Sequence, residues 1–381
     1  MAERRHVLIA GVSVRAFAAS AARGGYRVTA VDAFGDLDLR AVAEVITLRR
    51  DAGPGFSPGA ATAATRPVSA DLVAYTSNFE NDPPAVAALA RGRVLLGNPP
   101  TVLEQVRNPI TLMRTLRRRG LATPDTRASA PPADGRRWLL KPRRSGGGHG
   151  TSPWRRGRRV PRGAYLQERI DGVPGSIVFA ADGHRAVPLG LSRQLVGEPA
   201  FGARGFRYCG SLLASGRTPL FERQDELLER AAALAAAAAE AFGLRGLGGV
   251  DFIARAGVPL PIEVNPRWSA SMELVECAGG PSLFELHAAA CAGRLPGAPR
   301  PPGRTHGKAI IFARHDVVVP GGRWSRARIA DVPHPGERIR RGHPICTVLA
   351  DAADATGCLR ALTAAAAGIY RALEPRAQGA A

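Results

Sequence analysis

Lys141 is the residue whose type and position suggest chemistry most directly. It is one of only two lysines among 52 basic residues, and its compact ammonium group suits a phosphate oxygen. Gly146, Gly147, Gly148 and Gly150 follow it, and glycine backbone can approach a polyphosphate closely and turn N–H groups towards it. The run predicts a nucleotide-binding loop, with an unliganded flexible loop as the alternative. Because the lysine precedes the glycines, the run is not a Walker A loop.

Oxygen ligands suited to a metal ion lie farther along the chain. Asp251 lies on one predicted strand, and Glu263 and Asn265 lie on the next, after a short turn. Glu263 and Asn265 are two residues apart, so they project from the same face of their strand. Such oxygens suit Mg²⁺ bound with a polyphosphate, and Arg267 would hold a phosphate or a reacting acyl group. Exposed polar residues on a hairpin are the alternative, but the apolar neighbours of Glu263 and Asn265 favour a half-buried strand.

Together these motifs resemble those of the ATP-grasp ligases over about residues 102–290. In that superfamily a lysine and a glycine-rich loop lie over the phosphates, a Gln-Glu-x-Ile/Leu-x-Gly strand forms the adenine hinge, and Asp…Glu-x-Asn holds magnesium. The chain has these pieces in the same order: Lys141 with its glycines, Gln167-Glu-Arg-Ile-Asp-Gly172, and Asp251 before Glu263-Val-Asn265.

The resemblance assigns roles to residues of the nucleotide site. Lys141 would bind α- and β-phosphate oxygens, and the backbone of the glycine loop would cover the γ-phosphate. Glu168 would face the adenine amino group, with main-chain atoms of Arg169 and Asp171 on the adenine edge.

The resemblance also implies a metal centre and catalytic cations. Asp251, Glu263 and Asn265 would hold magnesium, expected as a pair of ions, with Mn²⁺ as a substitute. Arg267 and Lys141 would be the catalytic residues, because fixed positive charge stabilises acyl-phosphate and tetrahedral states.

Weaker candidates and departures complete the predicted site. His149 lies inside the glycine loop, where it would touch the γ-phosphate or else be exposed. Arg193, beside Gln194, would floor the phosphate site unless its strand is simply exposed. Arg107 stands where many ATP-grasp proteins carry an early lysine, and no acidic residue follows the hinge to hold the ribose.

The first hundred residues are predicted to form a Rossmann-like α/β unit, similar to a pre-ATP-grasp domain. The full Gly-x-Gly-x-x-Gly motif is missing, so we expect no nicotinamide cofactor. Residues 35–70 are rich in glycine, proline and alanine and are predicted to be loop-heavy. Short strands that end in small polar residues predict a ligand crevice at their carboxyl ends. The predicted strands are residues 7–10, 26–31, 72–75 and 94–96.

The remaining chain is predicted to form two further parts. Residues 101–300 would be a two-lobed ATP-grasp domain of α/β class (an α+β fold), with a lid at about 125–180. Within it, a strand at 164–170 is expected to pair with one at 176–180. Residues 301–381 would add a small β appendage and a last helix that complete the fold, with Lys308 in a structural role.

Composition limits the class of protein. A hydrophobic content of 45% predicts a substantial core. The net charge of +20 is spread along the chain, so nucleic-acid binding is not favoured. Five cysteines without a Cys-x-x-Cys pair suit a reducing cytoplasmic setting, and no apolar stretch is long enough to span a membrane.

The predicted function is ATP-dependent carboxylate–amine ligation through an acyl phosphate, with small-molecule acid and amine substrates. The resemblance is nearest to ATP-grasp proteins that include the archaeal tyramine–glutamate ligase of methanofuran synthesis, which suggests a role in making a one-carbon cofactor such as methylofuran or tetrahydromethanopterin. A homodimer is the assembly that the resemblance suggests. The alternatives are a biotin-carboxylase-like or purine-type carboxylase, and a non-catalytic nucleotide- or nucleic-acid-binding protein.

Overall fold

A parallel sheet forms the N-terminal domain of the chain. The computed structural model describes residues 4–48, 56–131, 135–297, 299–322 and 328–374. The sheet order is β3-β2-β1-β4-β5, with all neighbours parallel. The strands are β1 (His6–Ala10), β2 (Arg27–Asp32), β3 (Glu44–Thr47), β4 (Leu72–Tyr75) and β5 (Val94–Leu96). The helices are α1 (Arg15–Arg23), α2 (Leu37–Arg40), α3 (Pro58–Ala64), α4 (Pro83–Leu89) and the 3-10 helix η1 (Phe79–Asn81).

Residues 35–70 were expected to be loop-heavy, and the described part of that stretch also holds three short elements that were not expected. It contains α2, the edge strand β3 and α3. Each of these elements is short, and the stretch is rich in glycine, proline and alanine, so no helical or strand period could be recognised. α3 begins with a proline in its first turn, and the Ser57 hydroxyl accepts from the Ala60 N–H as an N-cap.

Asp32, at the end of β2, stabilises a turn within the N-terminal domain. Its carboxylate accepts hydrogen bonds from the main-chain N–H groups of Val14 at 2.8 Å, Phe34 at 2.7 Å and Gly35 at 2.8 Å. These contacts fix the turn that leads into α1. Both carboxylate oxygens of Asp32 therefore already accept hydrogen bonds, at the position where a dinucleotide fold would bind a ribose.

A four-stranded sheet forms the lid, which follows two helices. The helices are α5 (Pro100–Val106) and α6 (Pro109–Arg118), and Asn108 caps α6 through its side-chain oxygen. The order of the lid sheet is β6-β9-β7-β8. Its strands are β6 (Thr126–Arg127), β7 (Trp138–Pro142), β8 (Ser152–Pro153) and β9 (Ala164–Glu168).

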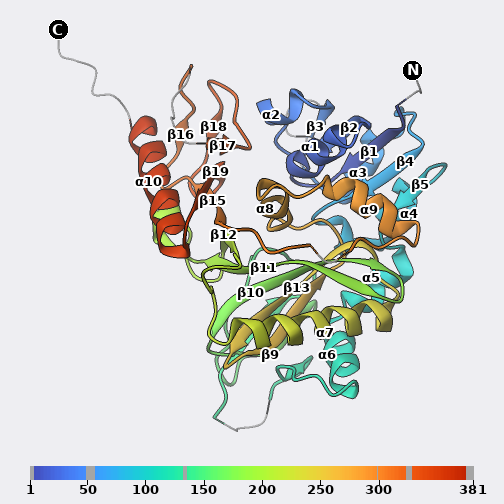
Figure 1. Cartoon of the computed structure of the whole chain (residues 1–381), viewed down its shortest axis with the longest axis vertical. Helices are drawn as coiled ribbons and strands as arrows, with labels where there is room; N and C mark the ends of the chain where they lie inside the picture. Colours follow the sequence, from blue (N-terminus) through green and yellow to red (C-terminus); the bar gives the residue numbers. More distant parts are fainter. Residues whose placement is uncertain (1–3, 49–55, 132–134, 298, 323–327, 375–381) are drawn as a thin grey trace.

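An eight-stranded antiparallel sheet forms the body of the molecule, in the order β14-β13-β10-β11-β12-β15-β19-β17. Helix α7 (Gln224–Phe242) packs on one face of it, as Figure 1 shows. The strands are β10 (Val173–Asp182), β11 (Ala186–Val196), β12 (Tyr208–Leu213), β13 (Arg245–Arg255), β14 (Val258–Asn265), β15 (Thr305–Phe312), β17 (Arg328–Ala330) and β19 (Pro344–Ala352).

The predicted pairing of residues 176–180 with the strand before them was wrong. β10 pairs with β11 and β13 of the large sheet, whereas β9 belongs to the lid. The chain crosses between the sheets at Gly172, where a Cβ would lie 2.4 Å from the carbonyl oxygen of Ala254. The lid therefore ends at this crossing and not near residue 180.

Helices from the ATP-grasp part tie the N-terminal domain to the large sheet. α8 (Met272–Cys277) lies between the N-terminal domain and the C-terminal strands in Figure 1, and α9 (Leu283–Cys291) packs against α1. Phe17 of α1 stacks on Trp268 at 4.8 Å between ring centroids and contacts Phe284 at 4.9 Å. The two parts therefore share one hydrophobic core.

The C-terminal part completes the large sheet. β15, β19 and β17 extend it, and α10 (Ala355–Leu373) covers β15 and β19. β16 (Val317–Val318) and β18 (Arg338–Ile339) make a separate two-stranded ribbon, and the 3-10 helix η2 (Pro199–Phe201) packs beside α10. None of the helices in the described part of the chain has the length and apolar character that crossing a membrane requires.

Candidate active site

A cavity of about 710 Å³ lies where the N-terminal domain, the lid and the large sheet meet. Ser13, Thr76 and Ser77 reach it from the carboxyl ends of the parallel strands, as the sequence predicted. The lid contributes Lys141 and the glycine loop, and the large sheet contributes the predicted metal ligands. This volume suits a nucleotide-sized ligand.

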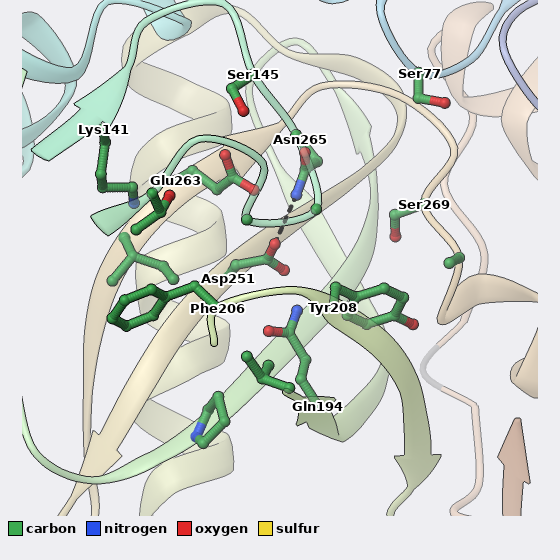
Figure 2. A pocket seen from close by; sticks show the side chains of 18 of the residues that line it. Ser77, Lys141, Ser145, Gln194, Phe206, Tyr208, Asp251, Glu263, Asn265 and Ser269 are labelled. Carbon is green, nitrogen blue, oxygen red and sulfur yellow. Dashed lines mark hydrogen bonds between the residues drawn. The ribbon is translucent and has the colours of Figure 1, made fainter. Parts of the chain in front are cut away.

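The three predicted metal ligands lie together on the hairpin of β13 and β14. Asp251 is directly opposite Glu263, and Asn265 is opposite Gly249. The Asn265 amide donates to Asp251 Oδ2 at 2.9 Å, the dashed line in Figure 2. The amide oxygen of Asn265 is therefore turned away from this bond and can act as a ligand.

The two carboxylates are half-buried and lie close together, which shifts their ionisation. Burial, and next the charge of Glu263, raise the pKa of Asp251 to about 7. Burial alone would raise the pKa of Glu263, but Arg107, Lys141 and Arg267 hold it below its usual value. A divalent cation would relieve the repulsion between the pair, so this set of hard oxygen donors fits magnesium.

Lys141 lies across the cavity from these ligands, on β7. Its ammonium donates to Gln167 Oε1 at 3.0 Å and lies 5.8 Å from the Tyr165 ring centroid. Figure 2 shows it extending towards Glu263. A compact cation in this place is suited to a phosphate next to the predicted metal ligands.

The glycine loop packs on the segment that enters β12. Gly147 and Gly148 have φ angles of 59° and 77°, a region that other residues rarely adopt. A Cβ on Gly148 would lie only 1.8 Å from the carbonyl oxygen of Phe206, whereas one on Gly146 would meet nothing within 4 Å. The N–H of Tyr208 donates to the Gly147 oxygen at 3.0 Å. Close approach therefore requires glycine at residue 148.

Two predicted nucleotide contacts lie outside the cavity. His149 is exposed and its side chain does not line the cavity, because the loop turns outwards after Gly148. Arg193 does not line it either, whereas its neighbour Gln194 does. Adjacent side chains on a strand face opposite sides. The sequence located this strand correctly, but Arg193 was chosen for the site, and its neighbour Gln194 is the residue that lines the cavity.

The predicted adenine hinge lines the cavity and links the lid to the large sheet. Glu168 Oε2 accepts from the Asp125 N–H at 3.1 Å, and the N–H of Arg169 donates to the Arg137 oxygen at 2.8 Å. Asp171 is exposed and forms an ion pair with Arg137. On Arg169 the main-chain carbonyl is therefore the group left for an adenine edge.

Arg267 is held by a residue that the sequence did not identify as its partner. Both its Nε and Nη2 donate to Glu80 Oε1, at 3.0 and 2.6 Å, and Nη1 donates to the Trp268 oxygen at 2.9 Å. Both side chains are buried, and Glu80 comes from the N-terminal domain. Because they are 187 residues apart, no local pattern could have paired them.

Arg107 occupies the position of the missing early lysine and contacts three parts of the site. It donates to the Val264 oxygen at 3.0 Å, to the Ser145 oxygen of the glycine loop at 3.2 Å and to Asn81 Oδ1 at 3.0 Å. It also lies 3.5 Å from Glu263 Oε2. The arginine therefore joins the metal-binding strand, the glycine loop and the N-terminal domain.

Further cavity residues were not predicted from the sequence. Phe206 and Tyr208 lie below the metal ligands in Figure 2. Arg15, Lys308 and Asp331 line another part of the wall, although Lys308 was expected to be structural. The retention of Lys308 in an arginine-rich chain was the one signal for this group.

Part of the chain matches a known protein family. Residues 106–271 match the model of a family described as an ATP-grasp domain. An uncharacterized protein of Methanocaldococcus jannaschii is 28% identical over 111 residues, which cover 29% of this chain and 27% of that relative. The matched stretch is thus well under two thirds of the relative's length.

Solved structures show the same architecture over nearly the whole chain. The biotin carboxylase domain of a Hydrogenobacter thermophilus 2-oxoglutarate carboxylase, in complex with MgADP and bicarbonate, is similar with a TM-score of 0.71 and 15% identity, covering 95% of this chain and 89% of that one. An L-amino acid ligase of Bacillus licheniformis is similar with a TM-score of 0.67 and 16% identity, covering 95% and 97%. At such identities the likeness establishes the fold alone.

The chain therefore has the ATP-grasp fold, with its ATP-grasp domain over residues 106–271. ATP-grasp proteins bind ATP with Mg²⁺, and the lysine, glycine loop and carboxylates that meet in this cavity are suited to that ligand.

Proposed function

We propose that the protein is an ATP-dependent ligase that activates a carboxylate as an acyl phosphate and transfers the acyl group to an amine. One observation carries the proposal: Lys141 and the glycine loop face Asp251, Glu263 and Asn265 across a single cavity. A half-buried cation opposite a pair of half-buried carboxylates suits a metal–polyphosphate complex, because the cation pairs with the phosphates and the carboxylates pair with the metal ion.

The residues have separable tasks in this reaction. A carboxylate oxygen of the acid substrate attacks the γ-phosphorus and ADP leaves; the amine then attacks the acyl carbon, phosphate leaves, and the nitrogen loses a proton. Lys141 and the glycine loop orient the phosphates, and Asp251, Glu263 and Asn265 would hold magnesium. Bound magnesium would neutralise charge on the transferring phosphoryl group.

Arg267 is placed to act on the acyl part of the reaction. Burial alone would lower its pKa, but Glu80 keeps the pKa above the usual value, so the side chain stays charged. A positive charge held in a fixed direction can stabilise the oxyanion of the tetrahedral state without reorganising. No covalent protein nucleophile is required.

ADP release with purified protein, Mg²⁺ and a panel of acids and amines tests the proposal. Lys141→Ala and Glu263→Ala should each abolish release while leaving the far-ultraviolet circular dichroism unchanged. Arg193→Ala is the matched control, because Arg193 lies in the large sheet, as Glu263 does, but outside the cavity. Turnover retained in both site variants would overturn the assignment.

The same assay addresses the alternatives. A carboxylase would release ADP only with bicarbonate, a choice motivated by the similar biotin carboxylase domain. A non-catalytic nucleic-acid-binding protein, motivated by the net charge of +20, would turn over no acid–amine pair and would bind DNA or RNA with a steep salt dependence. Use of the product in a one-carbon cofactor, cytoplasmic location and a homodimer stay predictions.

A further inference from the structure

A cluster of buried charges lines the cavity wall and has no task in ATP binding. Arg15 comes from the start of α1, Lys308 from β15, and Asp331 follows β17; all three face the cavity. Glu273 of α8 pairs with both cations. We call these four residues the charge cluster. Arg15, Glu273 and Lys308 are 7%, 7% and 4% exposed, so bulk water does not solvate them.

Contacts within the charge cluster fix each member. Arg15 Nε donates to Asp331 Oδ1 at 2.9 Å, and Glu273 accepts from both Arg15 and Lys308. The Thr347 hydroxyl donates to Asp331 Oδ2. Asp331 has a φ of 54°, in the left-handed region that few residues other than glycine, asparagine and aspartate adopt. The cluster is therefore held rigidly.

The cations keep the carboxylates of the cluster ionised. Burial alone would raise the pKa of Glu273, but Lys308 and Arg15 lower it to about 2. Arg15, and next Lys308, likewise hold the pKa of Asp331 below its usual value against the effect of burial. A further carboxylate, Asp38, lies 3.4 Å from Arg15 Nε, with 30% of its side chain exposed to solvent. A buried network of this kind adds little stability compared with apolar residues of the same size, which favours a role in binding.

The arrangement of charge restricts the ligand that can bind. The two cations attract a carboxylate, and the Asp331 carboxylate beside them attracts a cation, so a ligand with one charge of each sign can pair with both kinds of group. Two cations beside one carboxylate on the cavity wall match an α-carboxylate next to an α-ammonium.

We propose that Arg15, Lys308 and Asp331 form the head-group site for an α-amino acid, with its carboxylate on the two cations and its ammonium on Asp331. The inference rests on the proposed function for the view that the amino acid is a substrate. Ser77 and Ser269, which Figure 2 shows on the other side of the metal ligands from Lys141, also line the cavity and can bind its remaining polar atoms.

Binding can be measured without turnover, so the test omits ATP and Mg²⁺. Each of the twenty standard L-amino acids is titrated into the protein by calorimetry. Every amino acid that binds is then compared with the amine that lacks its carboxylate and the acid that lacks its ammonium. We expect at least one amino acid to bind, and each truncated analogue to bind at least about tenfold more weakly, because each loses a charge-assisted hydrogen bond.

Variants locate the site. Lys308→Gln should weaken amino-acid binding by about tenfold or more while MgATP still binds. Arg304→Gln is the matched control, since Arg304 precedes the same strand but pairs with Asp351 on the exposed surface. If Lys308→Gln does not fold, the double variant Lys308→Gln with Glu273→Gln keeps the charges balanced and replaces it.

Three results would overturn the inference: binding of no amino acid at millimolar concentration, equal binding of a truncated analogue, or unchanged binding in a folded Lys308 variant. Amino-acid binding without ADP release from any acid–amine pair would retain the head-group site and reject the ligase. ADP release with acids and amines that carry no zwitterionic group would retain the ligase and reject the head-group site.

Discussion

Replacing Gly148 by alanine tests whether the glycine loop must lie against the segment that enters β12. At this position φ is 77°, and the new Cβ would be 1.8 Å from the Phe206 carbonyl oxygen. The obstructing atom belongs to the backbone, so it cannot rotate away. The loop must therefore move off the segment, which also removes the hydrogen bond from the Tyr208 N–H to Gly147.

The size of the effect follows from these two losses. A left-handed alanine costs about 1 kcal/mol relative to glycine, and a main-chain hydrogen bond contributes about 1 kcal/mol. The closed loop is thus disfavoured by roughly 2 kcal/mol, which corresponds to about a 30-fold loss in kcat/KM for ATP. Because the loop can open without unfolding the sheets, the urea midpoint should change little.

Gly146→Ala is the control within the same loop, since a Cβ there meets nothing within 4 Å and its φ is not positive. Steady-state kinetics with varied ATP, together with urea unfolding of both variants, measure the difference. We expect Gly146→Ala to stay within about threefold of wild type. Equal kinetics for the two variants would refute the loop packing, and a large fall in stability for Gly148→Ala would show that the damage is not local.

Three further predictions concern other contacts. Glu80→Gln should lower kcat about 10- to 100-fold with KM for ATP nearly unchanged, because Arg267 loses its anionic partner and the ATP contacts stay; an unchanged kcat would contradict this. Arg107→Lys should raise KM for ATP about tenfold, since one ammonium cannot contact three segments; unaltered ATP saturation would count against it. Burial lowers the pKa of His287 to about 4. As pH falls from 6.5 to 4, we therefore expect wild type to lose about 3 kcal/mol of stability relative to His287→Gln, and a pH-independent difference in urea unfolding would exclude the shift.

Local patterns in the sequence were sufficient to predict the two strands that carry the predicted metal ligands. Asp251 was expected to lie opposite the neighbourhood of Glu263, and the hairpin pairs the two directly. A short turn between two apolar strands leaves almost no choice of register, and the period of two fixes the face. The strands of the parallel sheet, except the short edge strand β3, were located as short apolar runs, because central parallel strands such as β1 and β4 are buried on both faces.

Contacts between distant segments could not be read from the sequence. The cavity receives Gln194 in place of the predicted Arg193, because the face of β11 is fixed by pairing with β10 and β12 and not by its own residues. Arg15 and Asp331 meet across 316 residues. No periodicity links them, and their contact requires the whole chain to fold first.

The N-terminal domain contacts the candidate active site through one short turn. Glu80 holds Arg267 and Asn81 holds Arg107, and these adjacent residues lie in η1. Thr76 and Ser77, which line the cavity, precede the turn by only a few residues. A ligand seated on them therefore lies next to the backbone that fixes both guanidinium groups. Arg107 contacts the glycine loop, and Arg267 acts on the acyl group in the proposed reaction, so a displacement of the turn would disturb phosphate positioning and acyl transfer together.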